Sequence, residues 1–136
     1  DAVDLRKQAQ LRLSDSTHLD FRAAIAAHSK WKTTLRNAID SGEQLDADTI
    51  ARDDCCAVGK WVHGPGGHEW GTRPDFVNLV QRHREFHARA GEVAEAVNGG
   101  HRTEALRLLQ NGSPFTKATS AVVEALDALR RHHERG

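Results

Sequence analysis

Apolar residues recur at alternating three- and four-residue steps in two long stretches, which is the spacing of one face of an α-helix. The first stretch covers residues 15–40, with polar cap candidates at 14–16 and Gly42 just after it. The second covers residues 74–97, and Pro74 suits its first turn. The pattern therefore predicts two long helices, each with one buried face.

The rest of the chain also favours helices. Residues 43–62 are more polar, with sparse apolar positions, and we expect the Gly- and Pro-rich residues 64–67 to end any helix there. A short helix is predicted over 102–110 and a last long helix over 114–133. No stretch alternates in the manner of a β-strand. We therefore expect an all-α fold, an antiparallel four-helix bundle with a short extra helix.

The length of 136 residues corresponds to one compact domain. We assign residues 15–133 to the bundle and residues 1–14 to a charged leader, readable as the end of a preceding helix. The sequence contains no Met, so we expect it to be a segment of a longer protein. Part of its function would then depend on that parent protein.

Charge and hydropathy exclude two classes of partner. Lys plus Arg and Asp plus Glu number 19 each, which gives no excess positive charge for binding nucleic acid. The longest apolar run, residues 23–27, is far shorter than the roughly 18 residues of a membrane span. No charged leader with an apolar core marks the chain for export. We expect a cytoplasmic domain that contacts neither nucleic acid nor membrane.

Cysteine and histidine usage points to a metal. The two cysteines, Cys55 and Cys56, are adjacent and so cannot staple distant segments together. Nine histidines in 136 residues is a high number. Histidines together with cysteine in a reducing compartment indicate metal binding more than a disulfide framework.

Three histidines fall on predicted buried faces. His83 and His87 are four residues apart on one helix face, where two polar flank residues are the alternative interpretation. Burying both imidazoles unpaired would cost about 1–3 kcal/mol each, which a bound metal would offset. His28 lies in the apolar series of the first helix, and Cys56 can supply a thiolate from the second segment. Three imidazoles and one thiolate complete a tetrahedral zinc shell.

Three short motifs follow one another in a specific order: His28-Ser-Lys-Trp31, Cys56-Ala-Val-Gly-Lys-Trp61 and His83-Arg-Glu-Phe-His87. Over about residues 15–130 this pattern resembles the chemoreceptor zinc-binding domain, or CZB, family. The resemblance implies a cytosolic bacterial sensory four-helix bundle that dimerises. It also implies an attached output domain, either a methyl-accepting chemotaxis signalling domain or a diguanylate cyclase.

The resemblance further implies a zinc ion held by His28, Cys56, His83 and His87, with Trp31 and Trp61 as core aromatics near it. Two positions depart from the family pattern, and they are Cys55 and Val58. Cys55 could be a spare thiol, a competing ligand, an oxidation partner of Cys56 or an incidental small residue. We expect the remaining histidines to face solvent, at positions 18, 63, 68, 101, 132 and 133.

Three classes of function compete at this point. A zinc hydrolase of the His-Glu-x-x-His type is disfavoured because Glu85 lies about 200° around the helix from His83. A fourth protein ligand would also close the position that a catalytic zinc keeps for water. We therefore expect no enzyme activity but a sensor of zinc or of oxidants such as hypochlorous acid, with Cys56 as the redox-reactive residue. A purely structural, zinc-stabilised dimerisation domain is the alternative.

Overall fold

The computed structural model describes residues 19–135, and within them it contains helices and no β-strand. This confirms the all-α class, while the leader at 1–14 and the cap candidates at 14–16 lie outside the described residues. The helices are α2 (Phe21–Ser29), α3 (Trp31–Ser41), α4 (Ala47–Ala51), α5 (Ala57–Val62), α6 (Pro65–Trp70), α7 (Pro74–Asn98), α8 (Arg102–Leu108) and α9 (Pro114–Arg135).

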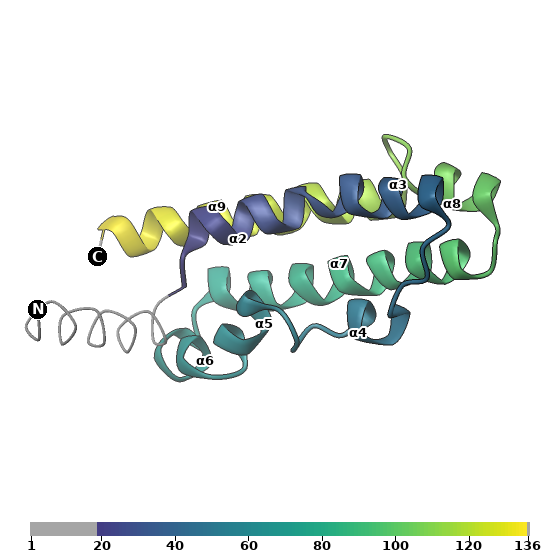
Figure 1. Ribbon diagram of the computed structural model, residues 1–136. Helices are drawn as coiled ribbons and strands as arrows, with labels where there is room; N and C mark the ends of the chain where they lie inside the picture. The colour runs from purple at the N-terminus through teal and green to yellow at the C-terminus, as the bar shows by residue number, and fades with distance from the viewer. Residues whose placement is uncertain (1–18, 136) are drawn as a thin grey trace, which may run out of the picture.

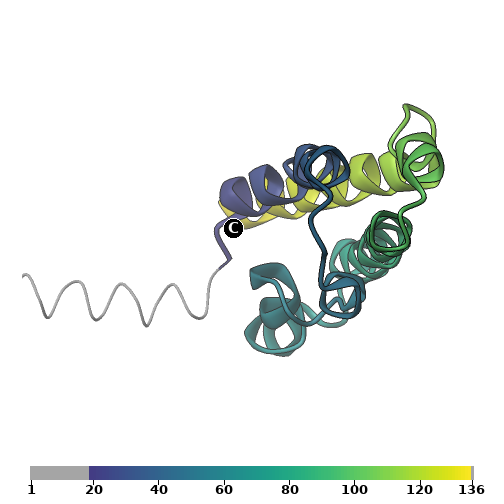
Figure 2. The same ribbon diagram turned by 45° about the vertical axis from the view of Figure 1, so that its right-hand side comes forward.

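The helices form two layers (Figures 1 and 2): α2–α3 lies beside α9 in one layer, and α7 lies with α4, α5 and α6 in the other. In Figure 1 the chain runs toward α8 through α2–α3, returns through α4–α6, advances again along α7 and returns along α9. In the described part, α7 and α9 each make one pass as a single long helix, and α2 with α3 makes another. The second pass consists of short helices, so a bundle of four main helices stays a prediction.

The first predicted helix is divided in two. Lys30 separates α2 from α3, but its backbone keeps the right-handed helical region, with φ −74° and ψ −19°. The pass therefore continues past the junction with little change of direction (Figure 1). Asp20 caps its start by accepting a hydrogen bond from the backbone N–H of Ala23 at 3.0 Å. Gly42 ends α3 with φ 72°, the left-handed conformation expected of a glycine there.

The Gly- and Pro-rich residues 64–67 end one helix, as expected, but a helix that the sequence analysis did not expect begins within them. Gly64 separates α5 from α6, and Pro65 begins α6, where a missing N–H leaves no hydrogen bond unmade. A Cβ added at Gly66 would lie 2.6 Å from the Trp61 ring, so glycine allows the indole to pack on the backbone of α6. Trp70 at the end of α6 is buried as well. The segment is thus part of the core.

The long helix α7 is the centre of the fold, as the apolar pattern over 74–97 predicts. It packs against α9, α4, α8 and α3. Its buried face includes Phe76, Leu79, Phe86 and Val93, and the same face carries His83 and His87. Two imidazoles are therefore enclosed by apolar side chains in the interior. None of the described helices has the length and apolar character that a membrane span requires.

The short helix α4 approaches α7 closely at Gly91. A Cβ added at Gly91 would lie 2.6 Å from the Cβ of Ala51, a separation that real Cβ atoms do not show. Gly91 lies one helical turn beyond His87, and the carbonyl of Ile50 accepts a hydrogen bond from His87 Nδ1 at 2.9 Å. The absence of a side chain at Gly91 therefore lets α4 reach this histidine.

Gly91→Ala tests this close approach. Alanine favours a helix by about 1 kcal/mol over glycine, so in open space the substitution would stabilise the protein. We expect destabilisation by about 1–3 kcal/mol in urea unfolding, because the methyl group displaces α4. Adding Ala51→Gly removes the opposing methyl group and should restore part of the loss. A single variant as stable as the wild type would contradict this packing.

Candidate metal centre

Four side chains from three parts of the chain meet inside the fold. His28 comes from α2, Cys56 from the residue before α5, and His83 and His87 from α7. Their ligand-type atoms all lie within 4.8 Å of one another. The three histidines are buried and Cys56 is half-buried. The structure thus brings together the four residues that the sequence indicates as ligands.

The spacing of three of the four atoms suits one small ion. Cys56 Sγ lies 3.1 Å from His83 Nε2 and 3.5 Å from His87 Nε2. The two Nε2 atoms are 3.1 Å apart. Around a tetrahedral zinc ion, with bonds of about 2.0–2.1 Å to nitrogen and 2.3 Å to sulfur, neighbouring ligand atoms are separated by about 3.3–3.6 Å. The observed distances are close to this range.

Backbone carbonyls fix the protonation of two of the imidazoles. His28 Nδ1 donates to the carbonyl of Ala24 at 2.8 Å, and His87 Nδ1 donates to that of Ile50 at 2.9 Å. A carbonyl can only accept, so the proton of each neutral ring is on Nδ1 and the lone pair is on Nε2. Such a partner behind the ring is typical of metal-binding histidines.

One lone pair at the centre has no partner. His28 Nε2 is buried and has no hydrogen-bond partner among the described residues. Leaving such an acceptor unsatisfied costs about 1–3 kcal/mol. A cation among the three Nε2 atoms and the sulfur would satisfy all four at once. The Nδ1 atom of His83 is also buried without a partner in the described part, and a cation there would not explain it.

Burial keeps these groups neutral. It lowers the pKa of His28 and of His87, and together with the neighbouring His87 and His28 it lowers the pKa of His83 to about 3. Burial likewise raises the pKa of the Cys56 thiol. The three imidazoles therefore have their lone pairs available for a metal, while the thiol must release a proton.

The loop before α5 determines where the sulfur lies. Cys56 is the N-terminal cap of α5, with extended backbone, and its Sγ accepts a hydrogen bond from the N–H of Gly59 at 3.4 Å. A Cβ added at Gly59 would lie 1.9 Å from the carbonyl oxygen of Asp53. Only glycine therefore lets residues 53–56 fold across the first turn of the helix. This explains why the motif requires glycine three residues after the cysteine.

Several aromatic side chains pack in the core around the candidate site. Trp61 is buried, but it packs edge to face against Phe21 and Phe76, and Trp31 is half-buried against the core. The ring that contacts the site is Phe86, whose centroid lies 5.0 Å from that of His28. The sequence analysis did not single out Phe86, although it stands directly before His87.

The other histidines whose side chains are described are exposed, as expected: His63, His68, His101 and His132. His63 Nε2 lies 3.3 Å from the Asp53 carboxylate. His132 Nδ1 lies 2.6 Å from that of Asp75. His18 and the side chain of His133 lie outside the described residues.

Comparison with protein families places these residues in a recognised zinc-binding family pattern. Residues 28–94 match the family model described as the chemoreceptor zinc-binding domain. The matched stretch begins at His28 and includes the other three residues of the site. Comparisons with curated proteins and with solved structures gave no match. Over residues 28–94, this match confirms the resemblance to chemoreceptor zinc-binding domains that the three motifs indicate.

Proposed function

We propose that this domain is the zinc-binding sensor of a bacterial signalling protein, with one zinc ion held by His28, Cys56, His83 and His87. The observation that carries the proposal is the convergence of buried acceptor nitrogens on one sulfur, with two of the imidazoles oriented by carbonyls. Zinc prefers such nitrogen and sulfur ligands. When bound, its charge would keep Cys56 as a thiolate.

A regulatory role fits the site better than a catalytic one. Four protein ligands complete a tetrahedral shell and leave no position for a reactive water. Glu85 lies between the two histidines of α7, where a zinc hydrolase motif has its catalytic glutamate. Its side chain is exposed and forms an ion pair with Arg89 at 2.8 Å. No carboxylate belongs to the ligand group found in the described residues.

The arrangement of the ligands suits a switch. His83 and His87 are fixed on the long helix α7, whereas Cys56 stands on a half-buried, non-helical turn. Oxidation of this thiolate to a sulfenic acid removes one ligand. Because the ligands connect α2, α7 and the start of α5, this loss would change how the helices pack. Hypochlorous acid or a change in zinc concentration would be the signal.

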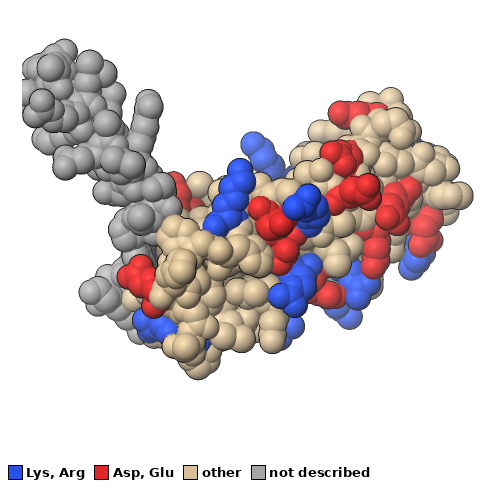
Figure 3. All heavy atoms as spheres, turned by 90° about the horizontal axis from the view of Figure 1, so that it is seen from below, with Lys and Arg blue, Asp and Glu red and all other residues tan. Residues whose placement is uncertain are grey.

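The parent protein would supply the output. We infer a cytoplasmic homodimer attached to a methyl-accepting signalling domain or a diguanylate cyclase. On the face shown in Figure 3, most Lys and Arg side chains lie beside Asp or Glu. The area over α5 and α6, which faces the viewer there, includes a broad region without charged side chains. The alternative is a structural domain in which zinc only stabilises a small core with buried histidines.

Metal analysis tests the ligand set. After purification without chelator, we expect one zinc per chain by elemental analysis, because the buried acceptors need a cation. His83→Ala should lose most of the zinc and lower the melting temperature, since zinc binding is also folding free energy. His68→Ala is the matched control, because that side chain is exposed. His132 is a poorer control because it pairs with Asp75. Iron, or no metal, in the wild type would refute the proposal.

Oxidant-driven zinc release separates the sensor from the structural alternative. In the variant Cys55→Ser, Cys56 is the one remaining thiol. We expect brief hypochlorous acid treatment to release zinc in step with oxidation of Cys56, while far-ultraviolet circular dichroism keeps its helical signal. Retention of zinc after Cys56 is oxidised would reject the switch and favour a structural role.

Light scattering tests the dimer. A core with three Trp and four Phe residues in a chain of 15.0 kDa is small, so a second copy is expected to cover part of its apolar surface. We expect a particle of about 30 kDa at micromolar concentration, which is twice the chain mass. A particle of 15.0 kDa would show that the domain is monomeric.

A further inference from the structure

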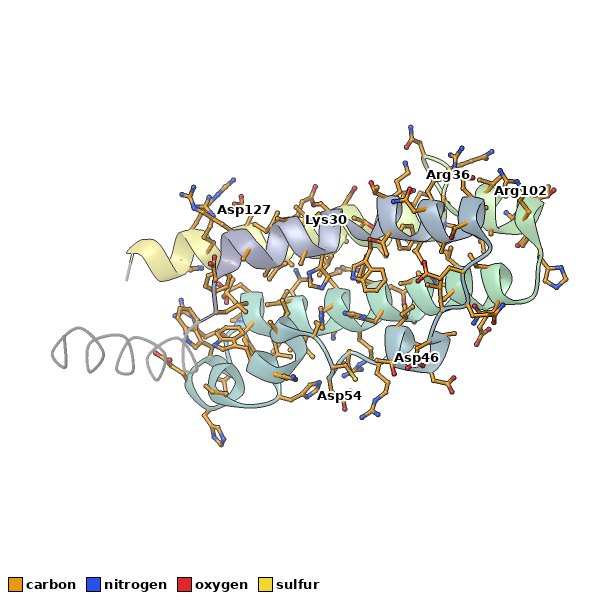
Figure 4. The ribbon with its side chains drawn as sticks, viewed as in Figure 1. Lys30, Arg36, Asp46, Asp54, Arg102 and Asp127 are labelled. Carbon is orange, nitrogen blue, oxygen red and sulfur yellow. The ribbon has the colours of Figure 1, made fainter. Side chains whose placement is uncertain are left out.

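Cys55 is a second thiol beside the site, and the ligand group does not include it. It lies in the turn between α4 and α5 and is half-buried. Its Sγ donates a hydrogen bond of 3.5 Å to Oδ1 of Asp54, whose carboxylate also accepts two hydrogen bonds of 3.0 Å from Arg52. In Figure 4 Asp54 projects from this turn at the surface. The Cys55 thiol is thus held by one long hydrogen bond near the surface.

We propose that Cys55 is a resolving thiol, which attacks oxidised Cys56 and forms a disulfide between the two neighbouring residues. The inference rests on the proposed function, because it requires Cys56 to be the oxidised zinc ligand. It assigns a modification to Cys55 and names its co-reactant as a two-electron oxidant such as hypochlorous acid. It also makes the switch reversible.

The reaction has two balanced steps. In the first, the Cys56 thiolate takes the oxygen of hypochlorous acid, so that a sulfenic acid forms, chloride leaves, and sulfur loses the two electrons that chlorine gains. In the second, Cys55 Sγ attacks Cys56 Sγ. The S–S bond forms as the S–O bond breaks, and the thiol proton leaves with the hydroxyl group as water.

The turn permits this second step. Residues 52–56 have no helical structure, so their backbone can rearrange without breaking a helix. Because the two thiols belong to neighbouring residues, the attack is intramolecular and precedes encounter with a second oxidant molecule. The disulfide would therefore protect Cys56 from the irreversible sulfinic and sulfonic acids.

Ring closure also explains how the site could be reset. Neighbouring Cα atoms are about 3.8 Å apart, below the usual range of about 4.4–6.8 Å for disulfide-linked residues. The ring is therefore strained, and strained disulfides are easily reduced. While it exists, Cys56 cannot act as a thiolate ligand. Thiol–disulfide exchange with a small thiol such as glutathione, which is itself oxidised to its disulfide, would return the ligand and, with it, the zinc site.

Mass spectrometry of the zinc-loaded chain tests the proposal. Trypsin releases residues 53–60 as one peptide that contains both cysteines. After three equivalents of hypochlorous acid, enough to take one thiol to the sulfonic acid, we expect the wild-type peptide mainly to lose two hydrogen atoms and gain no oxygen on Cys56. The same peptide from Cys55→Ser should gain two or three oxygen atoms on Cys56. After treatment with glutathione and zinc, the wild type should recover roughly ten times more bound zinc than the variant.

Controls separate this inference from the proposed function. Before oxidation, Cys55→Ser and Cys55→Ala should both hold as much zinc as the wild type, because Cys55 lies outside the ligand group. If oxidant releases zinc from wild type and variants alike, but the wild-type peptide gains oxygen, the resolving role alone is wrong. A disulfide between two chains would also overturn it. If no chain releases zinc, the sensor proposal itself fails.

Discussion

The need of three buried imidazoles for partners is the constraint on which the rest of this structure depends. The long helix α7 turns His83 and His87 into the core, where burial holds both rings neutral. A neutral imidazole has one donor and one acceptor, and both need partners once water is excluded. The carbonyl of Ile50 takes the donor of His87, which requires α4 to lie against α7. That approach in turn requires glycine at position 91.

The residues that face α7 across the site, from α2 and from the turn before α5, are subject to the same need for partners. Beside His83 and His87, α2 places a third imidazole, whose buried Nε2 has no hydrogen-bond partner in the described part, and the turn before α5 places the sulfur of Cys56. Such an arrangement is unfavourable as a set of side chains alone and favourable around a cation. The proposed zinc ion and the fold therefore stabilise one another. This coupling is what a sensor needs, since the occupancy of the site then affects helix packing.

Periodicity and motif spacing were enough to predict much of this site. His28, His83 and His87 occupy positions of apolar series, and Cys56 stands three residues before a glycine that the turn needs. The carbonyls of Ala24 and Ile50 could not be predicted, because every residue has one and the tertiary fold decides which is used. Helix α6 was missed for a related reason: Gly66 reads as a helix breaker until the Trp61 ring is seen to pack on it. The division at Lys30 leaves no mark in the apolar pattern.

The junction at Lys30 has a mechanical consequence. Because of the junction, His28 belongs to a separate nine-residue helix, α2, which packs against α9. Beyond the junction, α3 packs against α7 and α8. The start of α2 and the end of α9 lie at the same end of the molecule (Figure 1). A change in how His28 is held would therefore act first on α2, which packs against the last helix. A small shift of His28 at the centre of the fold would then tilt α2 relative to α9. These are the first and last helices of the described domain.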